Sequence, residues 1–201
     1  MARARIRQSL DIAESDVVLM YLGKFGGMYM EEEAFAFFKQ CVSFEGLALK
    51  IMVLSHDDHD RLRRLFEAWG IDEQYWSLKL AQRAEVPAYI SAADFGFVAV
   101  RQRPGKRFCS PIKDGEYWAC GLPLIIPDGI SDDYLLAEQH RIGIRMKDAS
   151  EASFEAVLLA MQDWVAREKV EAVRARCRAF ALQDRSVAVY QAIYRGIFEN
   201  I

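Results

Sequence analysis

The sequence predicts an α/β fold in which helices cover both faces of a parallel sheet of about six strands. Strand-like and helix-like segments alternate along residues 17–144. The segments at 17–23 and 48–54 are continuous apolar runs, which is typical of parallel strands buried on both faces. From residue 150 onward the spacing of apolar residues is helical. With 52% hydrophobic residues among 201, the chain can form one large domain over residues 1–201, although two small domains also fit this length.

The individual elements follow from local patterns along the chain. Strands are expected at 17–23, 48–54, 75–81, 95–100, 123–126 and 142–144. Helices are expected at 3–10, 29–44, 59–69, from about Pro87, and at 111–120, 131–140, 150–165, 167–181 and 184–199, with Ser131 as the N-cap of the helix at 131–140. This order predicts a Rossmann-like sheet, in which ligands bind beyond the carboxyl ends of the strands.

The short helix that follows Ser110 has clear start and stop signals. Ser110 is a favourable N-cap, and Pro111 suits the first helical position. Asp114 lies in the first turn, where the helix dipole favours a negative charge. Gly121 suits the residue after the last turn, where a left-handed conformation closes the helix.

The loop before this helix and its first turn carry a cluster of positive charge. All charged residues between 101 and 113 are basic: Arg101, Arg103, Lys106, Arg107 and Lys113. A basic loop that leads into an open helix N-terminus predicts an anion site. The alternative is a solvated loop with a surface ion pair between Lys113 and Glu116, which share a helix face.

Glycines follow two other predicted strands. Gly23, Lys24 and Gly26 come directly after the strand at 17–23, and Gly129 follows the strand at 123–126. A glycine-rich loop between a strand and a helix can hold a phosphate, and the alternative is a tight turn. Since the carboxyl ends of parallel strands meet at one edge, Gly23, Arg101 and Gly129 are expected to converge on one site.

The segment from Ser110 to Pro123 also resembles a known family signature. It reads Ser-Pro-Ile-Lys-x-x-Glu-Tyr-x-Ala-Cys-Gly-x-Pro. This is similar to the donor-binding signature of retaining glycosyltransferases of the GT-B type, family four (glycosyl transferases group 1). The resemblance implies that Lys113 faces the diphosphate of a nucleotide-sugar and Glu116 its ribose. Ser110, Pro111 and Ile112 belong to the same donor-binding signature.

Other loops fit the same resemblance. The loop with Gly23, Lys24 and Gly26 corresponds to the family's glycine-rich loop near the donor, and Gly129 to a loop near the donor sugar. Phe108 stands where the family often has a further glutamate that faces the donor hexose. Weaker correspondences within the donor site are Arg101, Arg107, Glu85 and Val86.

The resemblance covers only the second, donor-binding half of the GT-B fold, over essentially the whole chain. It implies a transferase that uses a nucleoside-diphosphate sugar without a cofactor, in polysaccharide or glycolipid synthesis. The N-terminal acceptor-binding domain is absent from the sequence, and no catalytic residue is assigned. Two alternatives are half of a nucleotide-sugar 2-epimerase-like isomerase, and a non-catalytic nucleotide-binding module.

Composition argues against several other classes of protein. A net charge of −3 and a pI of about 5.7 argue against nucleic-acid binding. Four scattered cysteines without a Cys-x-x-Cys pair indicate reduced thiols and a cytoplasmic protein: Cys41, Cys109, Cys120 and Cys177. No apolar run is long enough for a transmembrane helix.

The polar run from His56 to Asp60 permits two interpretations. Histidine and aspartate are metal ligands, but such a run between a strand and a helix also fits a turn with a helix N-cap. The second interpretation is preferred, and no essential metal is expected.

The last predicted helix has a broad apolar stripe. The stripe consists of Val187, Tyr190, Tyr194, Ile197, Phe198 and Ile201. The simpler interpretation, which is preferred, is that it packs on the core of its own domain. The resemblance implies instead that the helix crosses to the absent domain, which would leave the stripe exposed and able to drive self-association.

Overall fold

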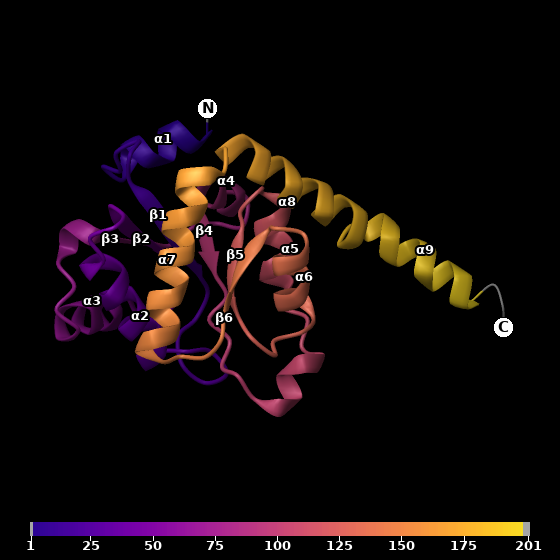
Figure 1. Cartoon of the computed structure of the whole chain (residues 1–201), viewed down its shortest axis with the longest axis horizontal. Helices are drawn as coiled ribbons and strands as arrows, with labels where there is room; N and C mark the ends of the chain where they lie inside the picture. The colour runs from indigo at the N-terminus through magenta and orange to yellow at the C-terminus, as the bar shows by residue number, and fades with distance from the viewer. Residues whose placement is uncertain (1, 199–201) are drawn as a thin grey trace.

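Six parallel strands form one sheet in the order β3-β2-β1-β4-β5-β6 (Figure 1). The computed structural model describes residues 2–198. The parallel order of all six strands confirms the predicted α/β fold. The strands are β1 (Val17–Leu22), β2 (Leu49–Leu54), β3 (Trp76–Lys79), β4 (Phe95–Phe97), β5 (Leu124–Pro127) and β6 (Gly143–Met146).

The direction of winding changes between β1 and β4. The chain runs outward from β1 to β3, then returns to place β4 beside β1, with Leu19 opposite Phe95 and Tyr21 opposite Phe97. In open α/β sheets, ligands bind in the crevice beyond the carboxyl ends of the strands at such a switch point. The loops with Gly23, Arg101 and Gly129 all start at this edge, as predicted.

One face of the sheet is covered by α2 (Glu32–Ser43), α3 (His59–Ala68) and α7 (Glu151–Arg167). Figure 1 shows α7 lying across this face. Phenylalanine rings fill the layer: the rings of Phe37 and Phe97 lie 5.1 Å apart, centroid to centroid. Each fully buried side chain of this size stabilises the fold by about 1.5–3 kcal/mol relative to its exposed state.

The other face is covered by α1 (Ala2–Ser9), α4 (Val86–Ala92), α5 (Ile112–Ala119), α6 (Asp133–Gln139) and α8 (Val170–Asp184). Tyr117 and Trp118 of α5 are completely buried. The indole nitrogen of Trp118 donates to the carbonyl oxygen of Ile142, at 3.0 Å. This packing fixes α5 against the sheet, so its first turn lies at the carboxyl edge.

Two helix starts differ from the prediction. Ser110 does not cap α5, because Pro111 is the extended flanking residue and its carbonyl oxygen accepts from the Asp114 amide at 3.1 Å. Ser131 does not cap α6 either, since its φ of +59° places it in a left-handed turn. The stop signal is as predicted, with Gly121 at φ +81° after the last turn of α5.

Two strands are shorter than predicted. The segment at 75–81 begins in a 3₁₀ turn, η1 (Glu73–Tyr75), before β3. The chain leaves the sheet after Phe97, and Val100 forms an antiparallel bridge with Tyr29 instead. A second 3₁₀ turn, η2 (Pro104–Phe108), lies in the basic loop before α5.

The last helix, α9 (Val187–Phe198), projects away from the sheet and the helices that cover it (Figure 1). Val187 is 72% exposed, Tyr194 60% and Phe198 70%, and Tyr190 and Ile197 are also exposed. The interpretation that this stripe packs on the domain's own core is therefore wrong. Ile201 lies outside the described residues. Over residues 2–198, no helix combines the length and the apolar character needed to cross a membrane.

Candidate functional site

Lys113 and Gly23 meet at the switch point of the sheet. A Cβ atom on Gly23 would lie 2.1 Å from Nζ of Lys113, so the lysine side chain occupies the space that the glycine leaves open. Gly23 also has φ +136°, a conformation that only glycine adopts readily. The ammonium group lies 4.5 Å from the ring centroid of Tyr29. The structure thus brings together two predicted site residues that are far apart in the sequence.

Lys113 has no anionic partner in residues 2–198. It is half-buried, and no carboxylate of these residues lies within ion-pair distance of its ammonium group, so the alternative of a surface pair with Glu116 does not form. Burial lowers the pKa of Lys113, while the nearby charges of Asp114 and Glu116 act in the opposite direction. A desolvated cation without a carboxylate partner at an open edge favours an anionic ligand.

A cavity of 320 Å³ lies beside this lysine. Small-molecule sites begin at about this size. Its walls come from the ends of β1 and β4, the following loops and the start of α5. They include Ser110, Pro111, Ile112, Lys113, Met28 and Tyr29.

A broader groove of 800 Å³ is lined by two further predicted residues, Arg107 and Gly129. Gly129 has φ +75° with open space around it. The guanidinium carbon of Arg107 lies 4.6 Å from the ring centroid of Phe108, and Phe108 is 79% exposed. Positive charge and an exposed aromatic ring therefore line this second groove.

A hydrogen bond to the loop after β2 fixes the glycine-rich loop that follows β1. The backbone amide of Phe25 donates to the Asp57 carboxylate at 2.7 Å. Gly26 has φ +80°, and Lys24 is exposed. This role of Asp57 was not predicted, because it depends on a contact between two loops that are distant in the sequence.

The polar run after β2 is a turn and helix cap, as preferred from the sequence. The carboxylate of Asp58 accepts from the amides of Asp60, at 2.9 Å, and Arg61, at 3.2 Å. Within residues 2–198, no group of three or more His, Cys, Asp or Glu side chains could hold a metal ion.

Several predicted residues do not line the Lys113 cavity, among them Lys24 and Gly26. Glu116 is exposed and does not line it. The guanidinium of Arg101 pairs with Glu33 of α2 at 3.4 Å. Glu85 accepts from the Gln82 amide at 2.9 Å before α4. Val86 packs against the hydrophobic core between the sheet and the helices on the α4 side.

The burial of two carboxyl groups, those of Asp114 and Asp133, was not predicted from the sequence. Asp114 is 0% exposed, although its place in the first turn of α5 predicted a negative charge favoured by the helix dipole. Asp133 of α6 is 1% exposed and accepts from Arg185. Burial raises the pKa of Asp114 well above its usual value, and the nearby Asp133 raises it further. The sequence carries no signal for this cluster, since its members come from three distant segments.

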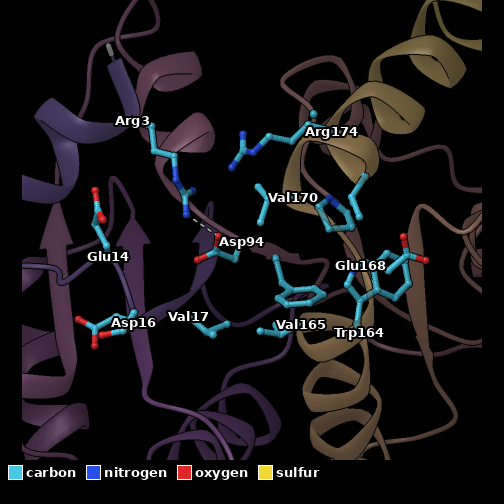
Figure 2. Close-up of a pocket in the computed structure, with 15 residues that line it drawn as sticks. Arg3, Glu14, Asp16, Val17, Asp94, Trp164, Val165, Glu168, Val170 and Arg174 are labelled. Atoms are coloured by element: carbon cyan, nitrogen blue, oxygen red, sulfur yellow. Dashed lines mark hydrogen bonds and ion pairs between the residues drawn. The ribbon is translucent and has the colours of Figure 1, made fainter.

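Another cavity, of 280 Å³, lies at the opposite edge of the sheet, by the amino ends of β1 and β4 (Figure 2). Arg3 of α1 pairs with Asp94 at 2.6 Å, and Arg174 of α8 donates to the Ala93 carbonyl oxygen at 2.7 Å. Glu168 pairs with Arg176 at 3.1 Å. These charges hold the surrounding elements together, so we assign this cavity a structural role.

Comparison with known proteins identifies the fold. No protein-family model matches the sequence, and no curated protein matches it. Among solved structures, HepE of Anabaena in complex with UDP superposes with a TM-score of 0.77 at 14% identity, over 100% of this chain and 53% of HepE. WaaG, a glycosyltransferase of lipopolysaccharide biosynthesis, gives 0.68 at 18% identity, over 90% of this chain and 46% of WaaG.

The chain thus spans about half the length of these proteins. The C-terminal domain of the group 1 glycosyl transferase LpcC from Francisella tularensis matches over almost its full extent. Its TM-score is 0.65 at 11% identity, with 92% of this chain and 93% of that domain covered. The protein described here therefore has the fold of the C-terminal domain of a GT-B glycosyltransferase.

Proposed function

We propose that this chain is the donor-binding half of a retaining glycosyltransferase, and that it holds a nucleoside-diphosphate sugar for polysaccharide or glycolipid synthesis. The observation that carries the proposal is Lys113, a half-buried cation at the switch point of the sheet that has no carboxylate partner among residues 2–198. A diphosphate supplies the negative charge that this position lacks. HepE, which shares the fold, was solved with UDP and with UDP-glucose.

The diphosphate would lie between Lys113 and the glycine loop. The first turn of α5 adds backbone amides that no side chain caps, and the positive end of the helix dipole. When the bond between the sugar and the diphosphate breaks, negative charge develops on the departing phosphate oxygen. Lys113 and these amides would stabilise that charge, which is the usual source of catalytic power in such a site.

The remaining residues of the site would orient the donor. Glu116, exposed one turn further along α5, would accept hydrogen bonds from the ribose hydroxyls. Arg107 and Gly129 in the neighbouring groove would lie toward the sugar. The acceptor-binding half would come from a separate segment or subunit, and we place the complete enzyme in the cytoplasm.

Titration calorimetry with uridine and guanosine diphosphates tests this proposal. The chain is expected to bind one of them weakly and without turnover. Lys113→Ala should weaken binding by about ten- to a hundredfold, because a hydrogen bond to a charged group contributes roughly 1.5–3 kcal/mol. Lys169→Ala removes an exposed lysine at the start of α8 and serves as the matched control. Absence of binding at millimolar nucleotide, or equal affinity of both variants, would overturn the proposal.

A further inference from the structure

Three charged side chains meet beneath the first turn of α5. Asp114 of α5 and Asp133 of α6 are both almost completely buried. The guanidinium of Arg185 donates to Asp133, and its side chain is 21% exposed. Arg185 lies between the end of α8 and the start of α9, so the cluster joins α5, α6 and the junction of the last two helices.

The two carboxyl groups need one proton between them. Neither oxygen of Asp114 has a hydrogen-bond donor from the described part of the chain, and a carboxylate can only accept. Asp133 raises the pKa of Asp114 because two neighbouring ionised carboxylates repel each other, so Asp114 is expected to hold a proton while Asp133 accepts from Arg185. With that proton, the pair carries one negative charge, which the single positive charge of Arg185 balances.

The other charged groups around Asp114 are on α5 and α6. Lys113 and Glu116 flank it on α5, together with the buried phenol of Tyr117. On α6, Asp132 lies 3.8 Å from the Arg185 guanidinium but is 73% exposed. A Cβ on Gly115 would lie 3.8 Å from the Cβ of Arg185, in ordinary van der Waals contact, so Arg185 lies about one methyl group away from the backbone of α5.

We propose that Asp114, Asp133 and Arg185 form a brace that holds the first turn of α5, and with it Lys113, in the position required for a diphosphate. Because Arg185 precedes α9, the brace links the root of that projecting helix to the ligand site. The effect on the ligand rests on the proposed function, whereas the brace itself does not. Arg185 is therefore a positioning residue, which acts on the ligand through Lys113.

Hydrogen exchange tests the brace without any ligand. In Arg185→Ala, one negative charge stays buried without its cation, and the hydrogen-bonded amides of α5 and α6 should lose protection by about tenfold more than the amides of β2. Asp132→Asn is the matched control, because it removes a neighbouring carboxylate that is exposed. Equal loss of protection in α5, α6 and β2 would indicate general destabilisation and overturn the brace.

Uridine diphosphate binding tests the link to Lys113. Arg185→Ala should weaken binding by about tenfold, a usual size for coupling between sites. When Asp133→Asn is added to Arg185→Ala, the charge that Arg185 neutralises is removed as well. This double variant should bind uridine diphosphate within about threefold of the wild type. Arg185→Ala with Asp132→Asn should stay weak.

These outcomes separate the two proposals. If Arg185→Ala binds like the wild type, or if both double variants bind alike, the positioning role is wrong. If the wild type binds neither uridine nor guanosine diphosphate, the proposed function fails, and hydrogen exchange still decides whether the brace exists.

Discussion

Replacement of Gly23 by alanine probes the contact on which the site depends. The new methyl group would meet Nζ of Lys113 at 2.1 Å and Cε at 3.1 Å, so the lysine must leave its present position. Its flexible end can move at little cost. The backbone cannot adapt as easily, because a φ of +136° for a residue with a side chain costs about 1–3 kcal/mol.

Two separate effects are therefore expected from Gly23→Ala. The free energy of unfolding should fall by about 1–3 kcal/mol, measured by urea denaturation. Affinity for a nucleoside diphosphate should fall by about ten- to a hundredfold, because the displaced ammonium no longer reaches the ligand. In a chain that already carries Lys113→Ala, the same change should have no further effect on affinity.

Gly27→Ala separates backbone strain from loss of the lysine position. Gly27 lies in the same loop with φ +64°, and a Cβ there would have no atom within 4 Å. This variant should lose stability but keep its affinity for the nucleotide. If Gly23→Ala binds the nucleotide as tightly as Gly27→Ala does, then Lys113 does not bind the ligand from the position described here.

Three further outcomes follow from the structure. Glu116→Ala should weaken nucleotide binding by about tenfold at any salt concentration, since its role with ribose depends on hydrogen-bond geometry, and unchanged affinity in calorimetry would remove it from the site. Tyr194→Ser with Ile197→Ser should lower self-association through α9 in sedimentation velocity, and a wild type that stays monomeric would refute that association. Because the pKa of Asp114 is raised in the folded chain, its contribution to the free energy of unfolding is present below the usual aspartate pKa and is lost as the pH rises through the folded value. In urea titrations, the free energy of unfolding of the wild type should therefore fall relative to that of Asp114→Asn as the pH rises from about 4. A difference between the two that is independent of pH would contradict this prediction.

The sheet could be predicted because its signals are local. Continuous apolar runs such as 17–23 mark buried strands, and their alternation with helices sets the parallel order. Gly23 and Lys113 could be assigned to one edge for the same reason. Their direct contact could not, since it depends on where α5 packs.

One error is local, and the others concern features that tertiary contacts decide. Ser110 has the right chemistry for a cap, yet Pro111 keeps the chain extended and the helix begins after it. Local spacing shows that α9 is apolar on one side but does not show what that side contacts. Asp114 suits the first turn of a helix as a negative charge, and its burial depends on other segments of the chain, which bring Asp133 and Arg185 close to it.

The location of a bound nucleoside diphosphate tests the central claim most directly. Titration of the ¹⁵N-labelled chain with uridine and guanosine diphosphates maps it residue by residue. Amide shifts should concentrate in residues 23–27 and in the first turn of α5 around Lys113. Shifts centred on the cavity at the opposite edge, around Trp164 and Arg174 (Figure 2), or no shifts at millimolar nucleotide, would contradict it.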